Sequence, residues 1–473
     1  MRQSKFRKEK DSLGEIDVPS DAYYGIQTLR AVHNFPISGL RPSNSLIQSI
    51  AMVKGAAAKA NVACGKLEPA TGKTIQRAAL EIIQGKSRGQ FVVDVFQAGA
   101  GTSFNMNANE VIANRGIELL GGRRGDYRRI HPNDHVNMSQ STNDVYPTSM
   151  RIASLLMVNG LQAAAFKLEK ALLVKAKEFT GLIKSGRTHL QDAVPIQLGQ
   201  EFSGYGRAIS RARNRIFHAA EALKELGLGG SAVGTGINTH PLYQKKVIAA
   251  LKNISGLSLS ASSNLFERMQ SMADFAALSG SLRELALELI RISNDLRLLS
   301  SGPRTGLAEI NLPPVQPGSS IMPGKVNPVM AEVTNMVGFQ VIGNDLAITL
   351  AVQAGQLELN VMMPVICFNI LQSLELLANV IEVFSERCIK GITANPRQCR
   401  KYAEESVGLS TILNPYIGYE AAAKVAQEAV TTGKSIREIV IERGILSLKQ
   451  VETIMDPFNM TGVKFQGKGL PKP

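Results

Sequence analysis

Apolar residues recur at every third or fourth position through most of the middle of the chain. The pattern is clearest where Leu265, Met269 and Met272 begin a stripe that continues to Ile292. This period matches the turn of an α-helix rather than the alternation of a strand. It predicts a series of long helices, and their length favours a helical bundle. The five predicted ranges are 150–180, 196–227, 262–300, 329–357 and 362–392.

The last two predicted helices are apolar on nearly every face. No Lys or Arg occurs between Lys325 and Arg387, which is also the pattern of a membrane span. Polar residues such as Glu358, Asn360 and Glu375 interrupt every window of about twenty residues, so we exclude a span and expect no membrane partner. A helix that is apolar on most faces is buried on most faces. Because a bundle from one chain cannot cover both helices, we expect several chains to share a helical core.

The two ends of the chain differ from this middle part. Glycines and prolines punctuate an irregular opening, and the first regular helix is predicted from Leu46 to Cys64. Shorter amphipathic helices are predicted from Arg397 to Met455. We therefore predict a mainly α protein with three domains. They are a mixed N-terminal domain at 1–141, a central long-helix bundle at 142–396 and a small helical C-terminal domain at 397–473.

Composition and charge exclude several classes of function. The net charge of +14 is spread along the chain without a nucleic-acid motif or aromatic platform, so it indicates a solvated basic surface and no nucleic-acid partner. Such a field would still attract a small dianion. Cys64, Cys367, Cys388 and Cys399 show no metal-ligand spacing, which is typical of free thiols in a reducing compartment. The first ten residues are charged rather than apolar, so we expect no secretory signal and a cytoplasmic location.

The segment from Gly318 to Pro328, GSSIMPGKVNP, is the most distinctive in the chain. It superficially resembles a phosphate-binding P-loop, but five residues separate its glycines and Val follows its Lys. An ordinary surface turn would not need so particular a run of hydroxyls, an ammonium and glycines. Asn327 is expected to cap the following helix, with Pro328 at its first position. The amides of that helix start would then face the loop and favour an anion.

Other segments place hydroxyl or amide side chains immediately before a predicted helix. They are Gly99–Ser103, Ser139–Asp144 and Gly186–Asp192, before helices expected at Met106, near Tyr146 and at Pro195. The first lacks the third glycine of a dinucleotide-binding fingerprint. Each segment alone is explained by helix capping. All of them together offer neutral donors and few charges, which indicates a shared pocket for carboxylates.

Together these segments resemble the aspartase/fumarase superfamily, whose most specific motif is the Gly318–Pro328 segment. The resemblance extends from Tyr24 to about Met460. The sequences AYYGIQTLRA at 22–31, STN at 141–143 and AGQLELN at 354–360 have the form of the aspartase branch. This implies removal of ammonia from L-aspartate to give fumarate. The alternative is a class II fumarase, which hydrates fumarate to L-malate.

One segment departs from the aspartase form. His131-Pro132-Asn133-Asp134 matches the fumarase pattern that forms a second anion site near the catalytic one. A simpler interpretation makes His131 a turn residue before Pro132, and we adopt it. The departure therefore concerns the choice of substrate and not the superfamily.

The resemblance also implies a role for each candidate residue. Donors to the β-carboxylate of the substrate are expected from Thr102, Ser141, Thr142 and Ser320. The α-carboxylate is expected to contact Lys325 and Asn327, with Thr188 nearby. The amino group is expected to contact Asn143 and His189, and His189 either orients it or transfers a proton.

Ser319 is the implied base that removes the carbon-bound proton. The electron pair left behind spreads onto the neighbouring carboxylate, giving an aci-carboxylate that donors in the pocket stabilise. A serine can act as a base only where amides, Lys325 and exclusion of water stabilise its alkoxide, as in a Gly/Pro-hinged loop that closes over substrate. The resemblance implies no cofactor and no metal. It implies a homotetramer whose active sites each draw on three chains.

Overall fold

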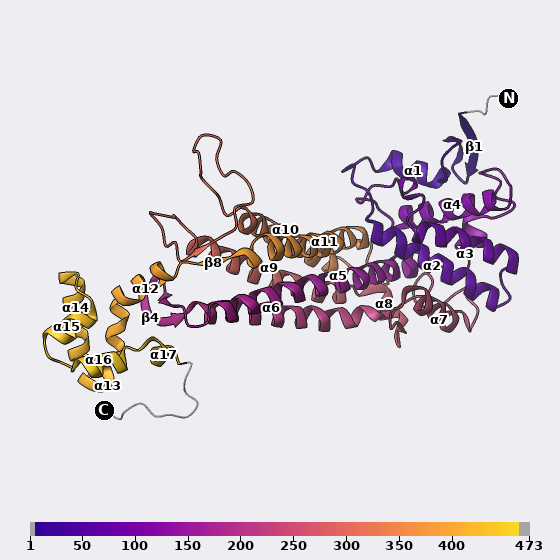
Figure 1. The fold of residues 1–473 in the computed structure, drawn as a ribbon. Helices are drawn as coiled ribbons and strands as arrows, with labels where there is room; N and C mark the ends of the chain where they lie inside the picture. Colours follow the sequence, from indigo (N-terminus) through magenta and orange to yellow (C-terminus); the bar gives the residue numbers. More distant parts are fainter. Residues whose placement is uncertain (1–4, 463–473) are drawn as a thin grey trace. The chain divides into compact units, whose positions relative to one another are not determined.

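The computed structural model describes residues 5–462 and is mainly α-helical, which confirms the predicted fold class (Figure 1). The chain forms two compact units, each assembled from separate stretches. Unit 1 comprises Met1–Ala163, Asn214–Ala286 and Phe339–Ala378, and unit 2 comprises Ala164–Arg213, Leu287–Gly338 and Asn379–Pro473. The domain boundaries predicted at residues 141 and 396 stay a prediction. Part of the predicted C-terminal domain, 463–473, lies outside the described residues.

The long helices predicted from the apolar period are present. They are α5 (Thr142–Glu178), α6 (Leu198–Glu221), α9 (Ala273–Leu299), α10 (Val329–Gln353) and α11 (Met363–Arg387). The third prediction was wrong in one respect, because the stripe is divided between α8 (Leu265–Gln270) and α9. The backbone is extended at Ser271, where α8 ends. Met269 and Met272 on either side of this break are still buried, so their spacing did not reveal it.

Unit 1 contains the N-terminal hairpin and α1 to α4, drawn in indigo and purple in Figure 1, together with α7. The hairpin pairs β1 (Phe6–Asp11) with β2 (Gly14–Pro19). The helices are α1 (Ile26–Asn34), α2 (Asn44–Ala63), α3 (Pro69–Ile83), α4 (Thr102–Leu119) and α7 (Tyr243–Ser255), and short β5 (Glu225–Leu226) pairs with β6 (Ser260–Ala261). α2, predicted from Leu46 to Cys64, packs on α3 and α7. α4 packs on α1 and α3, so the segment that leads into α4 is held by buried helices.

Unit 2 contains a second hairpin and the C-terminal helices. β3 (Ile183–Thr188) pairs with β4 (Gln191–Gln197), and β7 (Ile310–Asn311) pairs with β8 (Thr393–Ala394). The C-terminal helices, orange to yellow in Figure 1, are α12 (Pro396–Glu405), α13 (Asn414–Ile417), α14 (Tyr419–Thr432), α15 (Ile436–Glu442), α16 (Leu448–Ile454) and α17 (Pro457–Met460). α12 packs on β3. A small core that includes Leu413, Val440 and Val451 holds the later helices together, as the amphipathic pattern predicted.

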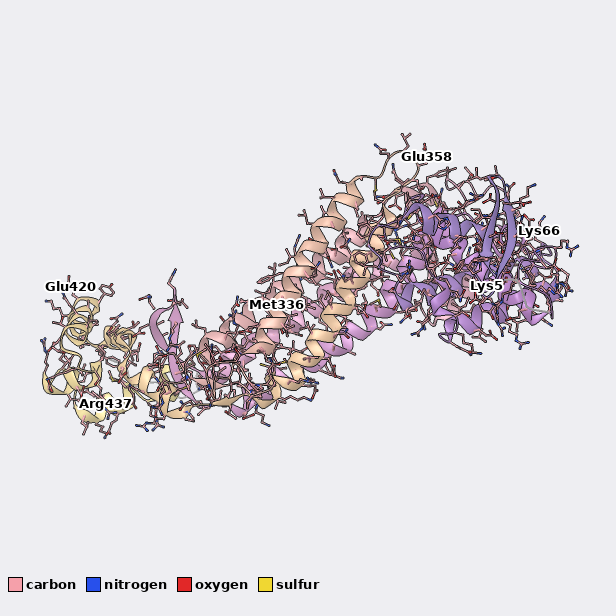
Figure 2. All side chains as sticks on the ribbon, turned by 90° about the horizontal axis from the view of Figure 1, so that it is seen from above. Lys5, Lys66, Met336, Glu358, Glu420 and Arg437 are labelled. Carbon is pink, nitrogen blue, oxygen red and sulfur yellow. The ribbon has the colours of Figure 1, made fainter. Side chains whose placement is uncertain are left out.

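Helix α10 leaves a continuous apolar stripe exposed in the single chain. Met336, Phe339, Leu346 and Leu350 are each more than half exposed and recur at helical spacing, and Met336 marks the stripe in Figure 2. By length and composition, α10 and the segment Met363–Gly391 could each cross a membrane, which is weak evidence because core helices meet the same test. Only 39% of the most apolar window of α10 is buried, against 61% for that of α11. α10 is therefore the helix that most needs a partner surface.

A buried carboxylate holds the second hairpin in unit 2. Glu309 is fully buried, and its Oε1 accepts a hydrogen bond of 2.9 Å from Arg187 Nη1. Its Oε2 lies 3.0 Å from Lys184 Nζ, which also donates to Glu201. Lys184 and Arg187 both belong to β3, immediately before Thr188. One carboxylate therefore fixes the strand that carries a candidate site residue.

Glu309→Gln should destabilise unit 2 markedly. The change removes the counter-charge of partly buried Arg187 and leaves buried Lys184 with Glu201 alone. Breaking a buried pair costs about 3–5 kcal/mol. The melting temperature should fall by several degrees in a calorimetric scan. Glu382→Gln is the matched control, since Glu382 pairs with Lys167 on the surface and should barely matter. Equal melting of both variants would show that Glu309 does not hold the hairpin.

Candidate active site

The Gly318–Pro328 segment forms a long loop that precedes α10 (Figure 1). Its two ends are tied together, since Gly318 N donates to Lys325 O at 2.8 Å and Asn327 Nδ2 donates to Gly318 O at 2.6 Å. A Cβ at Gly318 would lie 2.4 Å from Lys325 O, so only glycine fits this closure. Between the tied ends, Ile321 and Lys325 are exposed. The loop therefore has a fixed base and an open tip.

Ser319 lies just inside the tied base of this loop. Its Oγ accepts hydrogen bonds from Met322 N at 3.0 Å and from Ile321 N at 3.3 Å. Two amide donors aimed at one hydroxyl oxygen favour negative charge on that oxygen. The local geometry is thus the one that an alkoxide at Ser319 requires.

The predicted cap of the following helix was wrong. α10 begins at Val329, two positions later than the proposed cap, and the Asn327 side chain bonds back to Gly318 instead. The amides of the first turn bond to the carbonyls of Asn327 and Pro328. The Asn327 side-chain amide therefore closes the loop and does not cap the helix. The helix start consequently offers fewer free donors to the loop than the sequence suggested.

Thr188 and His189 do not precede a helix, which corrects another prediction. They lie at the turn between β3 and β4, and α6 begins only at Leu198 rather than at Pro195. His189 and Leu190 have φ values of 56° and 60°, the left-handed conformation of tight hairpin turns. Glycine or asparagine usually fills such positions, so the turn carried no sequence signal. All three side chains from Thr188 to Leu190 are exposed.

In unit 1 the starts of α4 and α5 come together. Thr102 is the first residue of α4, and its Oγ1 donates to Gly99 O at 2.6 Å. A Cβ on Gly101 would lie 2.4 Å from the Tyr146 ring of α5, so glycine permits this close approach. Asn105 Nδ2 of α4 donates to Thr142 Oγ1 of α5 at 3.1 Å. The hydroxyl-bearing segments at 102 and at 141–143 are therefore neighbours.

A glycine-rich segment that the sequence analysis missed supports the start of α5. Buried Asp144 accepts hydrogen bonds from the amides of Ser141, Gly229 and Ser231. Asn143 Nδ2 donates to Ala232 O at 2.8 Å. The run GLGGSAVGTG at 227–236 was the available signal, but nothing in its spacing linked it to residue 144. This contact leaves Asn143 Oδ1 as the atom of that amide able to accept from a ligand.

Two buried charged groups lie beneath this region. Burial lowers the pKa of Lys54 to about 7, and the Asp144 carboxylate partly counteracts that fall. Burial likewise raises the pKa of Asp144 to about 6, against the opposing effect of its three backbone hydrogen bonds and of Lys54. Burial thus disfavours the charged form of both groups, and such shifted pKa values are typical of functional sites.

His131 occupies the turn position that the simpler interpretation assigned to it. Its Nδ1 accepts hydrogen bonds of 3.2 Å from the amides of Asn133 and Asp134. It precedes a single π-helical turn, Pro132–Val136. A cavity of about 490 Å³ lies beside it, lined among others by Arg30 and Ser103.

The candidate residues divide between the units. Unit 1 carries Thr102, Ser141, Thr142 and Asn143, and unit 2 carries Thr188, His189, Ser319, Ser320, Lys325 and Asn327. Between residues 5 and 462, no group of three or more His, Cys, Asp or Glu side chains is arranged to hold a metal ion.

Known protein families match most of the chain. A family described as lyase matches residues 14–343, and one described as fumarase C C-terminus matches residues 409–462. An aspartate ammonia-lyase from Bacillus sp is 51% identical over 462 residues, which cover 98% of this chain and 99% of that protein.

Two solved structures share the fold of this chain over nearly its whole length. The crystal structure of fumarate lyase:delta crystallin from Brucella melitensis bound to cobalt is 52% identical, with a TM-score of 0.93 over 96% of this chain and 99% of that one. Recombinant class II fumarase from Schistosoma mansoni also gives a TM-score of 0.93, over 97% of this chain and 100% of that one. Its sequence identity is lower, at 36%.

Proposed function

The chain belongs to the aspartase/fumarase superfamily of lyases, and we propose that it catalyses the reversible removal of ammonia from L-aspartate to give fumarate. The observation that carries this proposal is the much greater identity to an aspartate ammonia-lyase than to a class II fumarase of the same fold. The STN sequence at 141–143 favours the same substrate. The activity is that of a carbon–nitrogen lyase, and the alternative is hydration of fumarate to L-malate.

Hydroxyl donors bind the β-carboxylate of aspartate. Thr102, Ser141 and Thr142 lie at the adjoining starts of α4 and α5, and Ser320 follows Ser319 in the loop. The Thr102 hydroxyl has to leave Gly99 O before it can donate to substrate. When the carbon-bound proton leaves, this carboxylate gains nearly a second negative charge. Donors fixed in advance stabilise that transition state more than the substrate, which is the source of rate enhancement.

Ser319 removes the proton from the carbon next to this carboxylate. The amides of Ile321 and Met322 already donate to its oxygen, which supports an alkoxide at that atom. Lys325 and Asn327 bind the α-carboxylate, with Thr188 nearby, and Lys325 adds positive charge close to the base. Closure of the exposed loop tip over substrate would exclude water and strengthen each of these interactions.

Asn143 and His189 contact the amino group. Asn143 Nδ2 is engaged by Ala232 O, so its Oδ1 accepts an N–H of the substrate. His189 lies at an exposed hairpin turn, where its ring either orients the amino group or transfers a proton as ammonia leaves.

The active enzyme is a homotetramer whose sites are each completed by three chains. The exposed stripe of α10 supports this assembly, since several large apolar side chains on one helix need a partner surface. Closed dihedral symmetry would bury four such stripes at once. One chain would supply Thr102 and Ser141–Asn143, a second Thr188 and His189, and a third the Ser319 loop.

The cytoplasm is the proposed location of the enzyme. Its cysteines are free, and Cys367, Cys388 and Cys399 are buried. Free thiols of this kind suit a reducing compartment. The proposal needs only small soluble substrates: L-aspartate, fumarate and ammonium.

The substrate can be tested directly. Purified enzyme should consume fumarate only when ammonium is supplied, with aspartate as the product identified by chromatography. Fumarate consumption is followed by its ultraviolet absorbance, with and without ammonium chloride at constant ionic strength. Rapid malate formation from fumarate in water alone would assign the chain to the fumarases.

Ser319→Ala should abolish turnover while the protein still folds and binds aspartate. The change removes one oxygen from a loop and leaves the core intact, so thermal stability should hardly move. Ser263→Ala, an exposed serine outside the site, is the matched control and should keep full activity. Retention of a tenth of the wild-type rate would exclude Ser319 as the base, since a tenfold loss is only about 1.4 kcal/mol of barrier.

Mixed tetramers should restore activity to two defective variants. Thr142→Val and Ser319→Ala chains, unfolded together and refolded, would place undamaged positions from different chains in the same site. With random mixing, about a quarter of the sites should draw both positions from undamaged chains, and activity should approach that share.

The control for this experiment is each variant refolded alone, which should stay nearly inactive. Formation of mixed tetramers is checked independently by mass spectrometry with one chain isotopically labelled. Mixed tetramers without recovered activity would contradict a site shared between chains.

A further inference from the structure

Lys54, in the middle of α2, is completely buried in unit 1. Its Nζ donates to Asn137 Oδ1 at 2.9 Å and to Gln140 Oε1 at 3.0 Å. Both acceptors belong to the turn that leads into α5. An ammonium group has three donors and no acceptor. Both of these amide side chains must therefore present their oxygen atoms to Lys54.

The orientation of the Asn137 amide in turn determines the orientation of the next amides in a chain of hydrogen bonds. Asn137 Oδ1 also accepts from Asn105 Nδ2 at 3.2 Å and from Asn109 Nδ2 at 3.1 Å. Because an oxygen faces them, both asparagines must present their NH₂ groups. Asn105 Nδ2 also donates to Thr142 Oγ1 at 3.1 Å. We call Lys54, Asn137, Asn105 and Thr142 the donor chain.

The direction of the donor chain decides what Thr142 can do. A hydroxyl has one proton and can also accept hydrogen bonds. Since Thr142 Oγ1 accepts from Asn105, its own proton is left to donate to a ligand. If the Asn105 amide were turned around, its oxygen would take that proton instead. The hydroxyl would then present only lone pairs to a carboxylate, which repels them.

The observed direction of the donor chain leaves two buried oxygen atoms unsatisfied. Asn105 Oδ1 and Asn109 Oδ1 are both buried without a hydrogen-bond partner among the described residues. A buried unsatisfied acceptor costs about 1–3 kcal/mol. Turning Asn105 around would satisfy its oxygen through the Thr142 hydroxyl. The observed arrangement therefore persists because Lys54 fixes Asn137 Oδ1 as an acceptor.

We propose that Lys54 is a positioning residue for the reaction: it sets the direction of the donor chain so that Thr142 donates its proton to the substrate carboxylate. This inference rests on the proposed function, in which Thr142 binds the β-carboxylate. The donated bond strengthens as the second negative charge develops. Its loss should therefore appear in kcat more than in KM.

The test replaces Lys54 by an unbranched side chain that is one atom shorter and cannot donate a hydrogen bond. Lys54→Met should lower kcat for aspartate by about 100-fold, the cost of one misdirected donor, with KM changed much less. Lys175→Met is the matched control, because Lys175 is also a buried lysine with two hydrogen bonds but lies in unit 2 outside the site. It should lose stability without this loss of kcat.

A double-mutant cycle separates positioning from structural support. If Lys54 acts through the Thr142 proton, Lys54→Met should cost little more in a Thr142→Val background, where that proton is already absent. Multiplied losses in the double variant would overturn the proposal. So would a Lys54→Met enzyme with wild-type kcat.

A second pair of variants serves if Lys54→Met fails to fold. Asn105→Asp offers Thr142 an acceptor and should lower kcat about as much as Lys54→Met. Asn105→Leu removes the neighbour without competing for the proton and should lower kcat less. A less active Asn105→Leu enzyme would show that the contact, and not its direction, matters.

All kinetics are measured with aspartate or, if the wild type turns over malate instead, with malate. Both substrates present the carboxylate that Thr142 is proposed to bind. A wild-type enzyme active only on malate would contradict the proposed substrate. The double-mutant cycle of Lys54 and Thr142 could still be interpreted in that case. An additive cycle in an enzyme active on aspartate would contradict the role of Lys54 alone.

Discussion

Much of this structure depends on the need of α10 to bury an apolar face that its own chain leaves exposed. The helix begins at Val329, directly after the tied base of the Ser319 loop. A surface that covers Met336 and Phe339 therefore also fixes the position of the two tied ends of the loop. In the proposed assembly, α10 would link assembly to catalysis, because the hydrophobic free energy that joins the chains would also set where Ser319 can reach. The proposed sharing of active sites between chains would then need no further structural device.

Within each unit, a buried ion holds the backbone that carries polar site residues. Asp144 binds three amides and joins the start of α5 to the glycine-rich segment at 227–236. Glu309 similarly holds β3 through Lys184 and Arg187. Buried charges are expensive unless they are fully paired, and well-packed apolar residues would often be as stable. Each charge also fixes which neighbouring atoms donate hydrogen bonds and which accept them, which an apolar residue could not do.

The sequence predicted the helices well because their signal is local. The apolar period located α2, α5, α6, α10 and α11, and the hydroxyl-rich segments at 102 and 141–143 proved to be neighbours. The errors arose where local pattern and structure diverge. The turn at His189 uses a left-handed conformation without glycine or asparagine, so the sequence predicted that Gly186–Asp192 leads into a helix at Pro195 and not into β4. The clamp of Asp144 on Gly229 joins residues far apart in sequence, which no periodicity or spacing could reveal.

The choice between ammonia and water as leaving group cannot reside in the carboxylate donors, because aspartate and malate carry the same two carboxylates. Asn143 is also insufficient. Its Nδ2 is held by Ala232 O, so in the proposed site its Oδ1 would accept from the leaving group, and an amino group or a hydroxyl can each donate to it. Discrimination must therefore come from groups that approach the leaving group from another side. In the proposed assembly that side is the hairpin turn of His189, whose position depends on Glu309 and on the packing of α12 against β3. Substrate preference in this fold is thus expected to follow changes in and beneath that hairpin more closely than changes in the Ser319 loop.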